Sequence, residues 1–276
     1  MKAQKRLTKK LLETCENNPN SVYWKNISNE VRLPESFIEK YKDRVNWNNI
    51  VISQKLSENF IELYSNKMNW KDISMYQKLS EPFIEKHNNE VDWMYISLYQ
   101  KLSEGFIEKY KNQVNWESIC RVQKLSESFI KKYENYIDWF TISLTQELSE
   151  KLIEKYDHKL YWPWISLKQK LSETFIEKYK EYVDWYDISK CQKLSEIFIE
   201  KYKDTLDWGW VSKFQKLSEV FIIKMKKYIN FNFLPIKKLN YNIINNCYEY
   251  IDRILVENEL DDKDILPEVR LYYEVG

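Results

Sequence analysis

The sequence predicts an all-α protein, an α-solenoid of short two-helix repeats. The first observation is a period of 23 residues, because a fixed period of this length is the signature of a repeat array. The second is the helical spacing of apolar residues inside each period, and the third is the presence of only 3 glycines in 276 residues. The period is carried by nine tryptophans, Trp24, Trp47, Trp70, Trp93, Trp116, Trp139, Trp162, Trp185 and Trp208, and Phe231 takes the next position.

Residues 1–23 lack the full pattern and are expected to form an N-terminal capping helix. Leu7, Leu11 and Leu12 would cover the apolar edge of the first repeat, and the basic residues around them would face water. The basic start of the chain is not followed by the apolar run of about seven or more residues of a secretory leader. No stretch approaches the roughly 20 apolar residues of a membrane span.

Residues 24–230 are expected to hold nine helical-hairpin repeats, and positions are counted here from the Trp as zero. Asp or Asn precedes most of these tryptophans and can cap a helix that begins at the Trp. Ser at +10 can cap a second helix that begins at Glu +11. Helices of some eight residues are marginal alone, so stacking against neighbouring repeats must stabilise them. The repeat from Trp93 shows the pattern: Ile96, Gln100, Leu102, Ser103, Glu104, Phe106, Ile107, Tyr110 and Val114.

Residues 231–276 are expected to form a degenerate repeat and a C-terminal cap. Ile243 and Ile244 echo the Phe-Ile pair of the regular repeats, and residues 255–276 are acidic and unpatterned. Four cysteines are scattered along the chain without a Cys-x-x-Cys pair. We expect them to be free thiols in a reducing, intracellular compartment such as the cytoplasm.

The phrase Gln-Lys-Leu-Ser-Glu-x-Phe-Ile-Glu-Lys-Tyr, followed by Val-Asp-Trp-x-x-Ile-Ser, resembles the tandem repeats in proteins of large DNA viruses, insect poxviruses and giant viruses among them. The resemblance covers roughly residues 24 to 230. It implies a viral, intracellular, non-enzymatic repeat protein, and it carries no functional residue over to this chain.

Positions that recur in nearly every repeat are interpreted as packing positions, because packing is the task that all repeats share. Gln at +7 has two interpretations: it bonds the backbone of the neighbouring inter-helix turn, or it forms a polar ladder that meets a periodic ligand. The first is favoured, since buried polar groups in a packed solenoid need partners. The Glu-Lys pairs at +15 and +16 are expected to form a solvated outer face.

The informative variation lies at +2 and +6, which project from one face of the first helix. Aromatic residues gather there, and the two tryptophans outside the period both occupy +2. An exposed row of Tyr, Trp and Phe is typical of interface hot spots, although the rings could instead be buried against a neighbouring turn. The predicted partner-binding residues are Tyr76, Tyr95, Tyr99, Trp164, Lys168, Trp210 and Phe214.

The sequence shows no catalytic, metal-binding or cofactor-binding constellation. His87 and His158 are the only histidines and have no companions of a triad or metal site, and no Gly-rich phosphate loop occurs. We therefore predict a non-enzymatic scaffold that binds a protein partner, with a host or host-defence factor as the candidate partner. The alternative is a helical-repeat protein that binds single-stranded nucleic acid, which the net charge of +1 disfavours.

Overall fold

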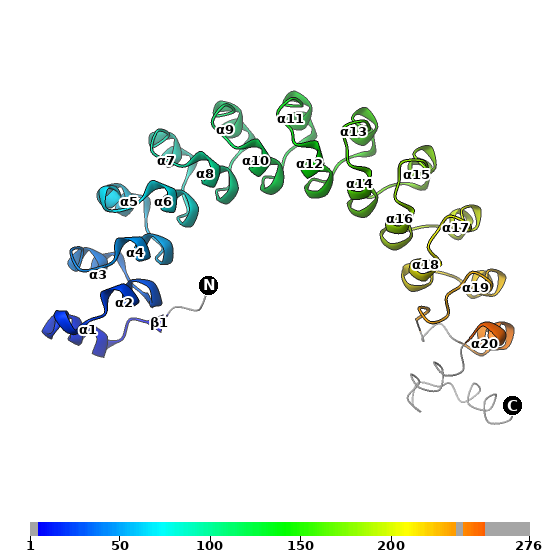
Figure 1. Ribbon diagram of the computed structural model, residues 1–276, viewed down its shortest axis with the longest axis horizontal. Coiled ribbons are helices and arrows are strands. Elements are labelled where there is room, and N and C mark those ends of the chain that lie inside the picture. Colours follow the sequence, from blue (N-terminus) through cyan, green and yellow to red (C-terminus); the bar gives the residue numbers. More distant parts are fainter. Residues whose placement is uncertain (1–4, 236–239, 252–276) are drawn as a thin grey trace, which may run out of the picture. The chain divides into compact units, whose positions relative to one another are not determined.

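The computed structural model describes residues 5–235 and 240–251. Its helices follow the 23-residue period and neighbouring first helices contact one another, so the predicted all-α solenoid is confirmed. The chain divides into two compact units, unit 1 (Met1–Gln146) and unit 2 (Glu147–Gly276), which are described separately. In each unit the first helices form one row on the inner side of its curve and the second helices form a row outside them (Figure 1). Every helix in the described ranges is too short or too polar to cross a bilayer.

Each first helix begins at the Trp of its repeat, and the Asp or Asn before that Trp caps the helix in every repeat except the first and the seventh, where Tyr23 and Tyr161 make no side-chain cap. The Asp92 carboxylate, for example, accepts hydrogen bonds from the N–H groups of Met94 and Tyr95 at 3.0 and 3.4 Å. The first helices of unit 1 are α2 (Trp24–Glu30), α4 (Trp47–Ser53), α6 (Trp70–Tyr76), α8 (Trp93–Tyr99), α10 (Trp116–Val122) and α12 (Trp139–Thr145). Those of unit 2 are α14 (Trp162–Lys168), α16 (Trp185–Cys191) and α18 (Trp208–Phe214).

Each second helix of a regular repeat begins at +11, because Ser at +10 accepts a hydrogen bond from the N–H at +13. The Ser103 hydroxyl and the Phe106 nitrogen lie 3.2 Å apart. The second helices of unit 1 are α3 (Glu35–Lys40), α5 (Glu58–Tyr64), which η2 (Ser65–Lys67) follows, α7 (Glu81–Lys86), α9 (Glu104–Lys109) and α11 (Glu127–Lys132). Those of unit 2 are α13 (Glu150–Lys155), α15 (Glu173–Lys178), α17 (Glu196–Lys201) and α19 (Glu219–Lys224).

The N-terminal segment contains the expected helix and a short strand that the sequence did not predict. Helix α1 (Lys9–Asn17) buries Cys15, and η1 (Pro19–Ser21) leads into α2. Strand β1 (Lys5–Arg6) pairs in parallel with β2 (Val31–Arg32). Strand β2 lies in the extended backbone that follows α2. Val31 stands there at +7, the position that Gln holds in the later repeats.

The C-terminal part of unit 2 retains the apolar pair of a second helix. Helix α20 (Tyr241–Cys247) contacts α19 and is followed by η4 (Tyr248–Tyr250). The Asn240 side chain caps α20 by accepting from the N–H of Ile243 at 2.9 Å, and Ile243 and Ile244 are buried. The predicted acidic stretch 255–276 lies outside the described residues.

The isoleucines at +3 and +14 form the dry centre of each repeat, whereas most tryptophans at zero are half-buried. Ile96 and Ile107 have no exposed surface. The ring centroid of Trp93 lies 4.8 Å from that of Tyr110, and its indole N–H donates to the Asn88 carbonyl at 3.0 Å. The Trp therefore joins the start of the first helix to the end of the second and to the turn before it. This is the packing role that we predicted, with the ring edge left at the surface.

Gln at +7 binds the backbone of the preceding repeat. The Gln100 amide nitrogen donates to the carbonyls of Ser74 and Gln77 at 2.9 and 2.7 Å, and its amide oxygen accepts from the N–H of Leu79 at 3.0 Å. The same three contacts recur at Gln54, Gln77, Gln123, Gln146 and Gln192, and all these side chains are buried. The internal interpretation of this Gln is thus confirmed, because both amide N–H groups bind backbone carbonyls and the side chain is buried.

Two further polar positions join successive repeats. Ser at +4 donates to the Trp carbonyl of its own helix and accepts from the N–H just before the next Trp; in Ser97 these distances are 2.6 and 2.9 Å. Glu at +11 accepts from the N–H and the hydroxyl of the next capping serine, as Glu104 does from Ser126 at 2.5 and 3.0 Å. The sequence pattern shows both residues, but their inter-repeat contacts appear only in the structure.

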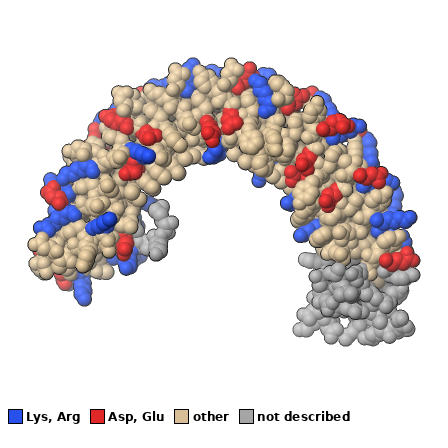
Figure 2. Space-filling view, in the orientation of Figure 1, with Lys and Arg blue, Asp and Glu red and all other residues tan. Residues whose placement is uncertain are grey.

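The outer row of second helices carries a ladder of ion pairs. Lys at +16 pairs with Glu at +15 of the preceding repeat, as Lys132 does with Glu108 at 2.5 Å. Side chains of both signs are visible over this row (Figure 2). The predicted solvated outer face is confirmed, and each exposed pair contributes little to stability by itself.

Candidate functional site

The predicted binding residues lie on the row of first helices. We define the first-helix face as positions +1, +2, +5 and +6, which form one exposed strip because residues three and four apart share a side of a helix. On this strip the residue at +6 is the more exposed of the predicted pair. Tyr99 and Phe214 are 50% and 52% exposed, whereas Tyr95 and Trp210 are half-buried.

In unit 1, α6 and α8 bring the predicted tyrosines together. The rings of Tyr95 and Tyr99 are stacked, with centroids 6.1 Å apart and planes 9° from parallel. The ammonium of Lys71, at +1 of α6, lies 5.3 Å from the Tyr95 ring. Tyr76 is 42% exposed. This part of the face therefore presents phenol rings with hydroxyl groups at the surface.

In unit 2, α16 and α18 form a tighter aromatic group. The rings of Trp210 and Phe214 are stacked with centroids 5.5 Å apart, and the Tyr186 ring meets Trp210 edge-on at 5.6 Å. Trp164 is half-buried and lies 6.0 Å from Tyr161, measured between ring centroids. Lys168 is exposed at +6 of α14.

Part of the +2 position is not available to a partner. Ser118 and Thr141 are buried at +2 of α10 and α12, and the Thr141 hydroxyl donates to the Asp138 carboxylate at 2.7 Å. Both of these side chains are small, whereas the rings at +2, Tyr95, Trp164 and Trp210, are half-buried.

The sequence-based set omitted residues at +1 and +5 that the structure exposes on the same face. Met94, Phe140 and Tyr186 at +1 are 50% to 55% exposed, and Lys190 and Lys213 at +5 flank Trp210. The helical period could have found them, because +1 and +5 lie beside +2 and +6 on a helix. The prediction included only +2 and +6, whereas the exposed strip also includes +1 and +5.

Titratable groups on the face of unit 2 are shifted mainly by burial. Burial, with a smaller contribution from the carboxylate of Asp184, raises the pKa of the Asp187 carboxyl. Burial likewise raises the pKa of the Cys191 thiol. Cys15, Cys120 and Cys247 are buried free thiols, and Cys191 is an exposed one.

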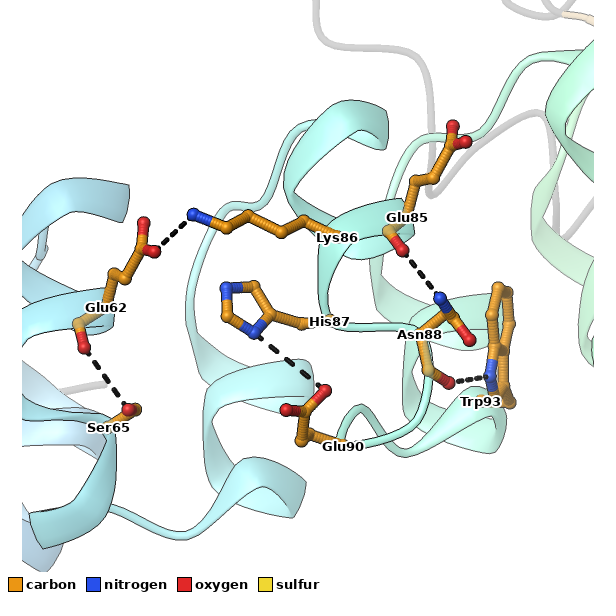
Figure 3. A network of polar contacts seen from close by, with 8 residues as sticks. All are labelled: Glu62, Ser65, Glu85, Lys86, His87, Asn88, Glu90 and Trp93. Atoms are coloured by element: carbon orange, nitrogen blue, oxygen red, sulfur yellow. Dashed lines mark hydrogen bonds and ion pairs between the residues drawn. The ribbon is translucent and has the colours of Figure 1, made fainter.

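His87 takes the place of the Tyr at +17 and is a packing residue. Its ring lies 4.7 Å from that of Trp70, and its Nδ1 lies 3.9 Å from the Glu90 carboxylate (Figure 3). Nε2 is buried and has no hydrogen-bond partner within residues 5–235 and 240–251. The neighbouring Lys86 pairs with Glu62 of the preceding repeat, so the ladder continues past the substitution.

Comparison with known proteins gives no match: the chain matches no family model, no curated protein and no solved structure. In the described part of the chain, no three His, Cys, Asp or Glu side chains gather in a way that could hold a metal ion. The first-helix face is therefore the candidate functional site.

Proposed function

We propose that the protein is a non-enzymatic scaffold that binds a protein partner along its first-helix face. The observation that carries this proposal is the set of half-exposed aromatic rings on that face, with Tyr76, Tyr95 and Tyr99 in unit 1 and Trp210 and Phe214 in unit 2. Aromatic side chains that are already packed on one side lose little conformational entropy on binding, and such residues dominate interface energetics. The repeat resemblance makes a host protein the first class of partner to test.

Binding of single-stranded nucleic acid receives less support from the same geometry. The Gln side chains that could read a strand are each bonded to three backbone groups, as Gln100 shows. A base stacks on an open face of an aromatic ring, and one face of Trp210 is already stacked on Phe214. Titration with single-stranded RNA and DNA at about 50 and 200 mM salt tests this function, because phosphate-driven binding weakens steeply as salt rises.

The proposal is tested by capture of the partner with matched surface variants. Trp210→Ala combined with Phe214→Ala removes the aromatic pair of unit 2, and we expect partner binding to weaken by about 2 kcal/mol or more. The control is Ile197→Ala combined with Val220→Ala, which removes two side chains that are 83% and 77% exposed on the second helices. This control should keep full binding.

Thermal unfolding of each variant separates binding from folding. The control and Tyr95→Ala with Tyr99→Ala should unfold close to the wild type, because exposed substitutions cost about 0.5 kcal/mol or less and half-buried ones about 1. Equal loss of partner in the control would place the interface elsewhere. Retention of partner by both aromatic variants would refute the proposed function.

A further inference from the structure

The first-helix face of unit 2 holds a compact group of aromatic rings and lysines. We call it the lysine–aromatic cluster, and its members are Tyr186, Lys190, Trp210, Lys213, Phe214 and Phe233. The Lys190 ammonium lies 4.7 Å from the Trp210 ring centroid, and the Lys213 ammonium lies 5.7 Å from it. Lys213 also lies 5.6 Å from Phe214 and 5.8 Å from Phe233. The cluster thus presents two cations on an apolar base.

Gly209 lies at the edge of the cluster, next to the Phe233 ring. A Cβ at this position would lie 3.6 Å from that ring, an ordinary van der Waals contact, and 3.1 Å from the Asp207 carboxylate, which is tight. Other first helices carry Met94, Phe140 or Tyr186 at the same position, and side chains of that length have no room beside Phe233.

Neither lysine of the cluster forms an ion pair with any described residue. The acidic groups nearby are otherwise placed: Asp207 accepts from the N–H of Trp210 at 3.0 Å, and Asp184 accepts from those of Tyr186 and Asp187. Asp187 is half-buried on α16; the charge of Lys190 partly offsets the rise in the pKa of its carboxyl, but the two groups form no ion pair in the described part of the chain. The lysines of the second helices differ, because Lys178, Lys201 and Lys224 each pair with a glutamate.

The rings of the cluster are already engaged on their faces. Phe214 stacks on Trp210 with planes 15° apart, and ammonium groups lie close to the rings of Trp210, Phe214 and Phe233. A nucleobase would have to displace these contacts before it could stack. A carboxylate needs no such displacement, since it binds the outer side of an ammonium that remains over the ring.

We propose that the partner segment bound by unit 2 carries carboxylates next to apolar side chains, and that Lys190 and Lys213 bind those carboxylates while Tyr186, Phe214 and Phe233 contact the apolar residues. This inference rests on the proposed function and assigns a chemistry to its partner. Charge complementarity of this kind selects the partner and speeds its encounter. Unit 1 offers a single such lysine, Lys71 beside Tyr95, and its Arg121 on α10 is paired with Glu117.

The test uses the full chain and a fluorescein-labelled peptide of about 12 residues in which Glu alternates with Leu and Phe. Fluorescence anisotropy should show binding that weakens by about tenfold or more in Lys190→Gln combined with Lys213→Gln, the loss of roughly one charge-assisted contact. Lys190→Arg combined with Lys213→Arg should keep the affinity within about threefold. A peptide with Gln in place of Glu should bind as weakly to the wild type as the acidic peptide does to the Gln variant.

The matched control is Lys101→Gln combined with Lys124→Gln, which removes the same charge from exposed lysines of unit 1 that form no ion pair with described residues. This control should bind the acidic peptide like the wild type. Equal weakening in the control would reduce the effect to net charge and overturn the inference, as would unchanged binding in the Lys190 and Lys213 variant or no binding to the wild type. Tighter binding of an oligothymidylate of equal charge would overturn it in favour of nucleic acid.

The two proposals fail separately. Loss of the captured partner in the Trp210 and Phe214 variant, together with full capture by the Lys190→Gln and Lys213→Gln variant, would keep the proposed function and refute the acidic partner. Retention of the partner by the aromatic variants of both units would refute the function itself.

Discussion

Unit 1 and unit 2 share one scaffold and differ on the face of their first helices. In unit 1 that face carries Tyr76, Tyr95 and Tyr99 with a single lysine, Lys71, beside Tyr95, and its Arg121 is paired with Glu117. In unit 2 it carries indole and phenyl rings flanked by Lys190 and Lys213, neither of which is paired within the described residues. Inter-repeat contacts therefore constrain the residues at the recurring positions, whereas the residues on the first-helix face differ between the units.

The shared scaffold has exceptions at its recurring positions in both units. Ser at +4, which links successive repeats, is replaced in unit 1 by Val51 and Cys120, whereas Ser166, Ser189 and Ser212 are all present in unit 2. The Tyr at +17 is replaced by His87 in unit 1 and by Met225 in unit 2. These exceptions allow the shared contacts to be measured one at a time, in the order of their expected size.

The largest effect should come from the Gln contacts, and it should be equal in the two units. Gln100→Leu in unit 1 and Gln192→Leu in unit 2 each leave two buried carbonyls and one N–H without a partner. We expect each to lower the free energy of unfolding by about 3 to 5 kcal/mol, measured by urea denaturation. Lys101→Ala, next to Gln100 and exposed, should change it by about 0.5 kcal/mol or less. A cost in one unit below half of that in the other would contradict the shared scaffold.

A smaller difference is expected at +4. Ser189 donates to the Trp185 carbonyl at 2.6 Å and accepts from the N–H of Asp207 at 2.9 Å, so Ser189→Ala should cost about 1 to 2 kcal/mol. Burial raises the pKa of the Cys120 thiol to about 11, and the N–H of Asp138 hydrogen-bonds to it, so this Cys is a neutral substitute for Ser. Cys120→Ser should therefore change the unfolding free energy by less than about 1 kcal/mol. A stabilisation above that would show that the thiol had failed to replace the hydroxyl.

At +17, replacing the exceptional residue should raise the free energy of unfolding. In the repeat before His87, the Tyr64 hydroxyl donates to Glu39 of the preceding repeat at 3.3 Å, whereas Nε2 of His87 is buried without a partner in the described residues. His87→Tyr should raise the unfolding free energy by about 0.5 to 1.5 kcal/mol. Tyr110→His, the converse change one repeat later, should lower it by a similar amount. Two changes of the same sign in thermal denaturation would refute this account.

The smallest effect should come from the ion-pair ladder, and it should be the same in both units. Hydrogen bonds from the next lysine lower the pKa of Glu62 and Glu108 in unit 1 and of Glu177 in unit 2 below the ordinary 4.5. Their stabilisation is complete above that value and is lost as the pH falls through the lowered pKa of the folded state. The unfolding midpoint should therefore decline shallowly below about pH 4.5.

Salt and substitution provide the control for the ladder. At about 1 M salt the acid-dependent decline should shrink, since these pairs are exposed and screened. Glu62→Gln combined with Glu108→Gln should also flatten the decline. A steep loss that is unaffected by either change would mean that a buried carboxyl controls acid stability.

Much of the fold could be predicted because its signals are local. An Asp or Asn side chain caps the first helix from the adjacent residue, as Asp92 does, and Ser103 caps the second from three residues away. Such contacts depend on neighbouring residues and can therefore be predicted from the sequence of a single repeat. The candidate site was only partly predictable for the same reason: Tyr95 and Tyr99 lie four residues apart, but the Lys190 contact with Trp210 joins different helices.

The amino-acid sequence was enough to predict the period, the two helices of each repeat and the residues at which those helices begin. What Gln100 binds, and that Glu104 binds the next capping serine, became evident from the packed repeats. The helix starts depend on residues within one helical turn of each other. The Gln and Glu contacts join groups some 20 residues apart, and these groups meet because the repeats are stacked.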